Sequence, residues 1–309
     1  MAGVTTVKVA ETDDGIRLNR WFLREYPSLS LSRLQKLLRT KQIKVDGKRA
    51  ETSTRLLAGQ EIRLPPLDEQ KAPLEEHFIS EKDKKMIQSL VIYKDDNIIA
   101  LNKPSGLAVQ GGTNQSKHID GLLDALMFEK EERPRLVHRI DKDTSGILLL
   151  ARNRQTAEKL TLAFREHKLP KTYLALVNGC PAQNSGEIDA PLLKVGEKMQ
   201  VSEQGQEAKS LYKVIDSVGK KYSLLELKPL SGRTHQLRVH TLFIGCPIVG
   251  DDKYFVAENK SQKLFVDKLH LHAYKIDLSV IYKNKTIITA PLPSYFTDGL
   301  NAVGISFKE

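Results

Sequence analysis

A dense cluster of charge stands directly before the longest strongly apolar run of the chain, residues 147–151. The surrounding sequence, LVHRIDKDTSGILLLARN (136–153), places a histidine, an arginine, a lysine and two aspartates just ahead of that run. A short apolar run cannot span a membrane, but it suits a strand buried in a folded core. We therefore expect Asp141 to lie at the mouth of a buried strand. If residues 138–141 are extended, Arg139 and Asp141 point to the same face.

The two aspartates of this segment admit two interpretations. Asp141 and Asp143 could cap the turn formed by residues 144–146 through side-chain hydrogen bonds to the backbone, which is a frequent role for aspartate. Alternatively, Asp141 could supply a carboxylate for chemistry. Taken alone, the segment favours capping, so the choice depends on what the rest of the chain places beside it.

The composition indicates a soluble globular protein with a sizeable core. The 309 residues are 40% hydrophobic and 28% charged, which leaves room for about two domains. The opening MAGVTTVKVAETDDG contains acidic residues and no apolar run long enough for a signal peptide or a membrane span. The two cysteines, Cys180 and Cys246, are far apart in sequence and indicate neither a disulfide framework nor a thiolate zinc site. We expect a cytoplasmic protein.

Most of the net charge of +10 is concentrated near the start, where residues 17–63 contain twelve Lys and Arg against four Asp and Glu. Apolar spacing in this stretch predicts a helix over 16–26 and a second helix that begins after Ser30 or Ser32. The following IKVDGKRA predicts a hairpin with a type I′ turn. The cations of the second helix and the hairpin are Arg33, Lys36, Arg39, Lys44, Lys48 and Arg49. They could be a solvated face, but their continuity favours binding to RNA or DNA.

The pattern along the chain divides it into two domains and a linker. We predict a basic module at 16–66, a charged linker at 67–90 and a second domain at 91–300. The second domain should open with a hairpin in VIYKDDNIIALNKPSG and continue with the strands GILLLAR, KTYLALVNG, LYKVI and YSLLELKPL, with helices near 118–127 and 154–167. Strands and helices do not alternate strictly. We therefore predict an α+β fold with a central mixed, largely antiparallel sheet.

A second charged cluster, LSGRTHQLRVHTLFIGCP (230–247), predicts a helix with Thr234 as its N-cap and Gly245 at its end. Arg233 would then stand just before the helix N-terminus, where unpaired N–H groups and the helix dipole already favour an anion. If Asp141 faces this point, its carboxylate is held ionised. An ionised carboxylate suits a nucleophile or a base better than a general acid.

The sequence predicts neither a metal site nor a nucleotide cofactor. His235 and His240 are five positions apart and diverge around a helix, and no HExxH motif or carboxylate facial set is present. His270 and His272 share one strand face, and we expect all four histidines to be structural or in contact with RNA. The segment QGGTNQ (110–115) lacks the GK[ST] of a phosphate-binding loop and the GxGxxG of a dinucleotide fold.

Four motifs in a fixed order resemble the RluA family of pseudouridine synthases. They are ALNKPSGLAVQGG (100–112), HRIDKDTSG (138–146), KTYLALVNG (171–179) and GRTHQLRVHTLFIGCPIVGDDKY (232–254), within a resemblance that runs from residue 91 to residue 293. Before them, residues 17–64 resemble the S-four-type (alpha-L) RNA-binding domain. Within the family, the layout is most similar to the RluC type, which modifies large-subunit (23S) ribosomal RNA.

This resemblance implies the pseudouridine synthase fold and the site-specific isomerisation of uridine in RNA. It implies that Asp141 is the essential aspartate and that Arg139 enters the RNA stack as the target uridine leaves it. It also implies that Tyr173 packs on the base, with a further role in proton removal left open, and that Arg233 pairs with the aspartate. The reaction needs no redox step, so no cofactor is implied. Whether the aspartate adds to the base or traps the ribose stays open, and we expect a monomer.

Two alternative functions are compatible with the same sequence. One is a non-catalytic factor that binds ribosomal RNA or assists ribosome assembly, which the basic module would suit. The presence of Asp141, Tyr173 and Arg233 together argues against it, because a degenerate enzyme should have lost at least one of them. The other is a pseudouridine synthase that acts on transfer RNA or on a different ribosomal uridine, and the motifs do not separate these substrates.

Overall fold

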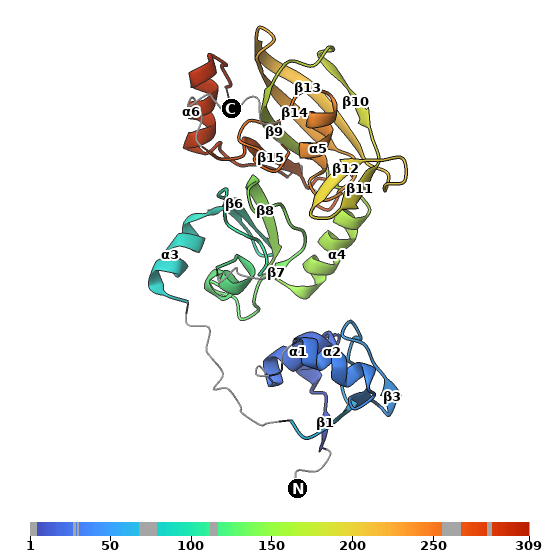
Figure 1. Ribbon diagram of the computed structural model, residues 1–309. Coiled ribbons are helices and arrows are strands. Elements are labelled where there is room, and N and C mark those ends of the chain that lie inside the picture. The colour runs from blue at the N-terminus through green and yellow to red at the C-terminus, as the bar shows by residue number, and fades with distance from the viewer. Residues whose placement is uncertain are drawn as a thin grey trace. The chain divides into compact units, whose positions relative to one another are not determined.

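The chain forms two compact units, Met1–Phe78 and Ile79–Glu309 (Figure 1). The structure is a computed structural model, and it describes residues 5–26, 29, 31–67, 79–111, 117–254, 267–282 and 286–308. Within these ranges no helix is long and apolar enough to cross a membrane.

The N-terminal unit packs two helices and a small sheet around one apolar core. Its elements are β1 Thr5–Lys8, the 3₁₀ helix η1 Glu11–Asp13, α1 Leu18–Glu25, α2 Leu31–Arg39, β2 Lys44–Val45, β3 Lys48–Arg49 and β4 Glu61–Leu64, and the strands lie in the order β1-β4-β2-β3. Trp21 and Phe22 of α1 pack with Leu34 of α2 in this core. The predicted hairpin turn is confirmed, because Asp46 and Gly47 have φ angles of 49° and 72°, as a type I′ turn requires.

Two of the predicted domain boundaries differ from the structure: the start of the N-terminal module and the end of the linker. The N-terminal unit begins before residue 16, because β1 pairs with β4. The predicted linker at 67–90 contains the helix α3 Glu81–Ser89, whose N-cap Ser80 accepts a hydrogen bond from the backbone of Asp83. Ile87 of this helix is buried in an apolar cluster of the second unit. The high charge of the segment obscured a helix that needs only one apolar stripe.

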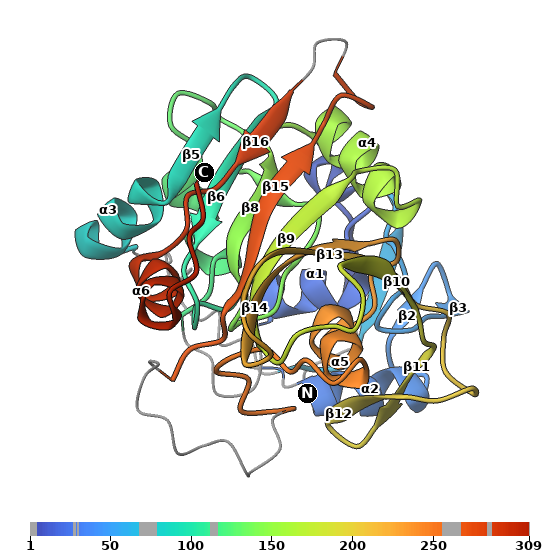
Figure 2. The ribbon, with the colours of Figure 1, turned by 90° about the horizontal axis from the view of Figure 1, so that it is seen from above.

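The second unit is built around a large mixed sheet, as predicted. The elements that follow α3 are β5 Val91–Lys94, β6 Ile98–Lys103, the 3₁₀ helix η2 Asp120–Leu126, β7 Arg135–Leu136, β8 Ser145–Ala151, α4 Arg154–Arg165, β9 Lys171–Asn178, β10 Ser185–Asp189, β11 Leu192–Val195, β12 Lys198–Val201, β13 Lys209–Val218, β14 Tyr222–Pro229, α5 Gln236–Phe243, β15 Leu271–Asp277, β16 Ile287–Thr289 and α6 Ser294–Val303. The described strands run β10-β13-β14-β9-β15-β8-β6-β5, with β7 beside β8 and β16 beside β15 (Figure 2). The β8–β15 pair is parallel, whereas β8 is antiparallel to β6 and β15 is antiparallel to β9.

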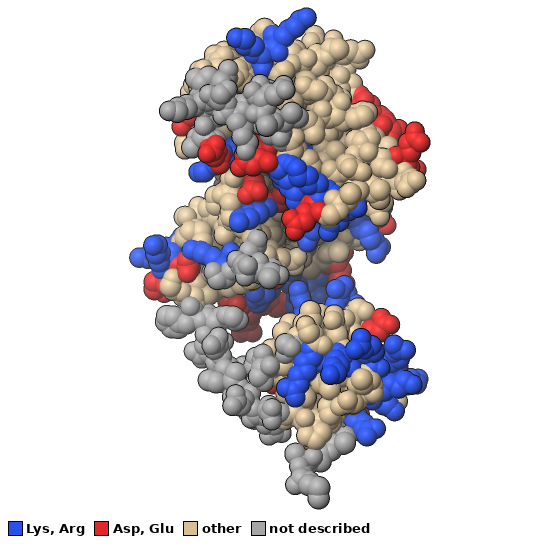
Figure 3. Space-filling model, in the orientation of Figure 1, with Lys and Arg blue, Asp and Glu red and all other residues tan. Residues whose placement is uncertain are grey.

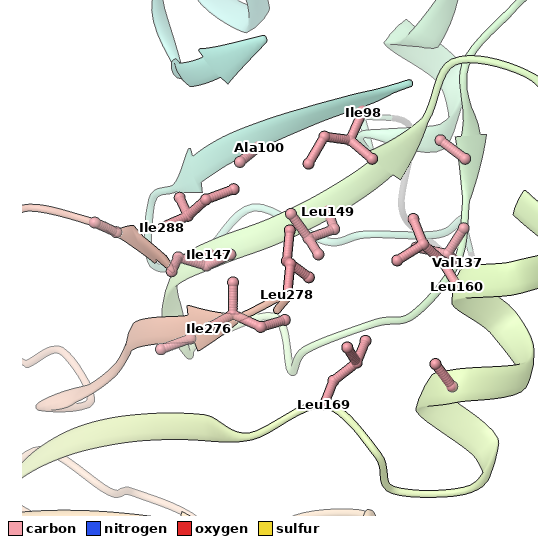
Figure 4. Packing of buried hydrophobic residues seen from close by; sticks show 14 residues of the cluster. Ile98, Ala100, Val137, Ile147, Leu149, Leu160, Leu169, Ile276, Leu278 and Ile288 are labelled. Carbon is pink, nitrogen blue, oxygen red and sulfur yellow. The ribbon is translucent and has the colours of Figure 1, made fainter. Parts of the chain in front are cut away.

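Strand β8 is an interior strand of this sheet, between β15 and β6, and all seven of its residues are buried. Its side chains alternate between two apolar clusters: Ile147 and Leu149 pack on one face (Figure 4) and Leu148 on the other. Burying one such side chain contributes about 1.5–3 kcal/mol. Residues 145 and 146 were predicted as part of a turn, but they begin the strand. A Cβ on Gly146, whose φ is +103°, would lie 2.3 Å from a backbone oxygen of β15, so only glycine permits this strand pairing.

Candidate active site

A cleft of about 600 Å³ opens beside the N-terminal end of β8, and its lining includes Arg139, Asp141, Tyr173 and Arg233. The structure therefore brings the four site residues that the sequence predicted into one place. Asp141 comes from the loop before β8, Tyr173 from β9, and Arg233 from the segment between β14 and α5. A pocket of this size suits a single nucleotide removed from a stack.

A buried lysine anchors the loop that carries Asp141. Lys103, at the end of β6, is fully buried, and its ammonium donates hydrogen bonds to the carbonyls of Pro104, Leu107 and Lys142 at 3.0, 2.9 and 2.8 Å. Burial lowers the pKa of Lys103 to about 7, and the nearby Asp143 and Asp141 carboxylates oppose that shift. Three carbonyl acceptors stabilise the ammonium where it would otherwise be costly. Lys103 was not among the predicted site residues, although its place directly after an apolar strand was a visible signal.

The turn after Lys103 also holds the backbone of the aspartate loop. The amide of Gly106 donates to the carbonyl of Lys142 at 2.9 Å, and the hydroxyl of Ser105 donates to the carbonyl of Asp143 at 2.8 Å. The first and second motifs are therefore joined through backbone atoms. These contacts hold the backbone of residues 142 and 143 and do not involve the carboxylate of Asp141. The side chain of Asp141 is 31% exposed and lines the cleft.

His138 fixes the other side of the same loop. Its Nε2 accepts a hydrogen bond from the amide of Leu149 at 2.8 Å, and its ring stacks on Phe164 with centroids 4.2 Å apart. Burial, with a smaller contribution from the charge of Lys171, lowers the pKa of His138 to about 3, so the ring is neutral at physiological pH. With His138 held inward, the exposed Arg139 is available at the cleft.

Tyr173 lies on the inner wall of the cleft. Its backbone is fixed between Leu227 of β14 and Ala273 of β15. Burial raises the pKa of the phenol well above its usual range, and the charge of Asp141 adds to the shift. Tyr173 is therefore a neutral aromatic surface at physiological pH, which suits stacking on a base.

The position of Arg233 differs from the sequence expectation in its contacts. Its Nε donates to the carbonyl of Glu207 at 3.0 Å, and among the described residues it forms no ion pair with Asp141 within 4.0 Å. The predicted N-cap was also wrong: the helix α5 is preceded by His235 at φ 52°, not capped by Thr234. No side-chain cap hydrogen bond forms at the N-cap His235. Instead, Oε1 of Gln236 accepts a hydrogen bond from the amide of Arg233 at 3.0 Å and ties the segment before the helix to its first residue.

Among the described residues, His235 is the basic residue with a side-chain nitrogen within 4.0 Å of the Asp141 carboxylate. The distance from His235 Nε2 to Asp141 Oδ1 is 3.9 Å. The other ring nitrogen, Nδ1, lies 2.7 Å from the hydroxyl of Tyr254. From the sequence, His235 was expected to be a structural or RNA-contacting histidine. The spacing of residues along the chain does not show that the second and fourth motifs meet at Asp141.

The remaining predicted residues are not among those that line this cleft. Arg33, Lys36, Arg39, Lys44, Lys48 and Arg49 belong to the N-terminal unit. His240 is buried and bonded to Ser210 and to the carbonyl of Ala190, and His272 is bonded to Ser145 and Ala290. These two histidines have structural roles. In the described part of the chain, no group of three or more His, Cys, Asp or Glu is arranged to hold a metal ion.

Comparison with known proteins defines the class. The pattern of the family "RNA pseudouridylate synthase" matches residues 97–242. The chain is 40% identical over 294 residues to the "Ribosomal large subunit pseudouridine synthase C" of Rickettsia felis, covering 91% of this chain and 95% of that one. It is 36% identical to the protein of the same name from Vibrio vulnificus, covering 88% of each. The solved structure of "Human RNA Pseudouridylate Synthase Domain Containing 4" is 29% identical, with a TM-score of 0.63 over 73% of this chain and 97% of that chain.

The cleft, the sheet and these matches together define an RNA-modifying isomerase. The chain belongs to the RNA pseudouridylate synthase family, and it isomerises uridine to pseudouridine in RNA.

Proposed function

We propose that this enzyme modifies a uridine of large-subunit ribosomal RNA and that Asp141 is its essential carboxylate. The observation that carries the proposal is the convergence of Asp141, Arg139, Tyr173 and Arg233 on one cleft. Relatives that cover nine-tenths of the chain are named for the large ribosomal subunit, which supports that substrate over transfer RNA. The enzyme would then act where these ribosomes are assembled, which in a bacterium is the cytoplasm.

The side chains of the cleft can serve several steps of the reaction. The N1–C1′ bond breaks, the uracil turns, and C5 joins C1′, after which C5 loses its proton and N1 gains one. The ionised carboxylate of Asp141 can add to the base or to C1′. The neutral ring of Tyr173 can hold the detached uracil by stacking. A base adduct and a ribose adduct both use this ionised carboxylate as the nucleophile.

The two arginines of the cleft would act on the RNA. Arg139 is exposed beside Asp141 and can fill the space that the target uridine leaves in the stack. Flipping a base out costs a few kcal/mol, which contacts of this kind offset. Arg233 would turn from the carbonyl of Glu207 to Asp141 or to a phosphate when RNA enters, since a guanidinium can bind either anion with two hydrogen bonds.

The N-terminal unit would act as the RNA-binding module of the S-four type. Five of the six predicted RNA-binding cations are exposed and Lys44 is half-buried, and Figure 3 shows Lys and Arg gathered on the face of this unit that the view presents. Arg24 is excluded from that role, because both of its terminal nitrogens lie 2.6 Å from the carboxylate oxygens of Asp13. A positively charged surface binds the phosphate backbone of RNA without recognising the base sequence.

Mapping of pseudouridines across total RNA tests the proposal. Cells that lack the gene should lose one or more pseudouridines of the large-subunit ribosomal RNA. A wild-type copy should restore them, an Asp141→Asn copy should not, and an Asp143→Asn copy should restore most of them. Loss of pseudouridine from transfer RNA alone would instead establish the transfer-RNA enzyme, and restoration by the Asp141→Asn copy would refute the role of Asp141.

A further inference from the structure

We infer that His235 is a positioning residue for Asp141, donating a hydrogen bond from Nε2 to the carboxylate when RNA fills the cleft, and that Tyr254 fixes the tautomer required. The inference rests on the proposed role of Asp141. In the structure the Nε2–Oδ1 distance of 3.9 Å is too long for a direct hydrogen bond. Hydrogen bonds of catalytic groups are often long in the absence of substrate and tighten in the complex.

The hydroxyl of Tyr254 determines where the imidazole proton lies. This oxygen accepts a hydrogen bond from the amide of Met199 at 3.0 Å, so its own proton needs an acceptor. Tyr254 is 7% exposed, and among the described residues the acceptor within reach is His235 Nδ1, at 2.7 Å. A neutral imidazole carries one proton. If Nδ1 accepts from Tyr254, that proton is on Nε2, the nitrogen that faces Asp141.

A buried ion pair holds Tyr254 in place. Arg238 binds Asp251 through Nε at 2.9 Å and through Nη2 at 2.6 Å, and both side chains are almost fully buried. The guanidinium of Arg238 lies 5.1 Å from the centre of the Tyr254 ring. The carboxylate of Asp251 also accepts from the amide of Tyr254. Tyr254, and through it His235, is thus held by contacts to a buried ion pair.

Burial lowers the pKa of His235 and favours its neutral form. The groups that face it are Asp141 from the loop before β8, Arg238 from its own helix, and Asp251, Lys253 and Tyr254 from the segment after α5. Burial lowers the pKa of His235 most, Arg238 and Lys253 lower it further, and the two aspartates oppose them. A neutral donor favours the ionised form of the carboxylate that it faces. Removing the donor should therefore raise the pH at which Asp141 loses activity by protonation.

The test is the pH profile of tritium release from C5-labelled uridine in a large-subunit ribosomal RNA transcript, measured in single-turnover reactions with full-length enzyme. In His235→Leu we expect the rate at pH 7 to fall about tenfold. The midpoint of the acidic side of the pH–rate curve should rise by about one pH unit, which corresponds to the free energy of one hydrogen bond to a charged group. His235→Gln keeps an N–H donor and should have a midpoint near that of the wild type. Tyr254→Phe should give an intermediate shift, because the tautomer is no longer fixed.

His240→Gln is the matched control, because His240 lies on the same helix but is bonded to Ser210 and Ala190. His240→Gln should lower the melting temperature but leave the midpoint of the acidic side of the pH–rate curve unchanged. An unchanged midpoint in His235→Leu and Tyr254→Phe, or equal shifts in His235→Leu and His235→Gln, would overturn the inference. Asp141→Asn separates this from failure of the proposed function: if that variant releases tritium normally, Asp141 is not the essential group, whatever the histidine variants do.

Discussion

The two units of the molecule place their charged side chains in opposite ways. In the N-terminal unit the predicted RNA-binding cations surround an apolar core and reach solvent. In the second unit Lys103, Arg238 and Asp251 are buried, and each is bonded to particular atoms. A buried charge is costly unless it is paired. An exposed cation of the N-terminal unit is replaceable, because it contributes to a summed field over the phosphates.

This difference separates the two tasks of the enzyme. In the second unit, buried charges fix the geometry around Asp141, so single substitutions there should damage the chemical step or the fold. In the N-terminal unit, single substitutions should have small effects and only combined changes should be visible. The predictions below run from the largest expected effect to the smallest.

Lys103→Met should damage both the stability and the turnover of the enzyme. It keeps much of the side-chain volume but leaves the carbonyls of Pro104, Leu107 and Lys142 without their donor. We expect a loss of about 3 kcal/mol in the free energy of unfolding, together with a large drop in turnover, because the Asp141 loop loses its anchor. Urea unfolding followed by circular dichroism measures the first effect. The exposed Lys220→Met should change stability by less than about 0.5 kcal/mol, and equal stability of the two variants would contradict the anchoring role.

Arg233→Lys should reduce turnover about a hundredfold, the size of effect expected when one donor to a reacting group is lost. A lysine keeps the charge but loses the planar fork that binds an anion with two hydrogen bonds. Because Arg233 is exposed, the melting temperature should stay close to that of the wild type. Arg165→Lys, another exposed arginine that lines the cleft, is the control and should retain most of the activity. Similar rates for both variants would remove Arg233 from the site.

Tyr173→Phe should lose less activity than Tyr173→Ala. The phenylalanine keeps the ring that stacks on the base, and the raised pKa of Tyr173 makes its hydroxyl a poor proton acceptor. Stacking on a base is worth about 1–3 kcal/mol, so the alanine variant should be slower than the phenylalanine variant by roughly tenfold or more. Equal and complete loss in both variants would show that the hydroxyl, and not the ring, is essential.

Reversal of Arg33, Lys36 and Arg39 to glutamate should leave the chemical step unchanged and weaken RNA affinity. Each lost phosphate contact lowers the slope of log K against log salt by about 0.7–0.9. Deletion of residues 1–78 should act in the same direction and should spare the second unit, because it retains the Ser80 cap of α3. Filter binding of a ribosomal RNA fragment over a salt series measures the slope. An unchanged slope in both variants would mean that the basic stripe is only a solvated surface.

Local pattern was sufficient to predict much of the fold. Three features could be predicted from sequence because each depends on neighbouring residues: the apolar run of β8, the hairpin of β5 and β6, and the Asp46-Gly47 turn. The α+β class with a mixed sheet followed from the order of the elements. The helix α3 was not predicted. Its many charged and few apolar residues made the segment resemble a linker in composition.

The contacts between motifs could not be predicted from sequence. The parallel pairing of β8 with β15 joins residues more than a hundred positions apart, and it depends on the absence of a side chain at Gly146. The same is true of His235, which meets Asp141 only because the whole sheet brings their loops together. The site residues Asp141, Tyr173 and Arg233 were identified by resemblance, whereas Lys103 and Tyr254 emerged from burial and hydrogen bonding alone.

The comparison of the two units is tested most directly by single-turnover tritium release at saturating RNA, with Asp141→Asn and the triple reversal of Arg33, Lys36 and Arg39 measured side by side. Saturation removes differences in affinity, so the rate reports only the chemical step. We expect no detectable tritium release by Asp141→Asn and a wild-type rate of release by the triple reversal. Substantial release by Asp141→Asn, or a reversal variant that stays slow at saturating RNA, would contradict this expectation.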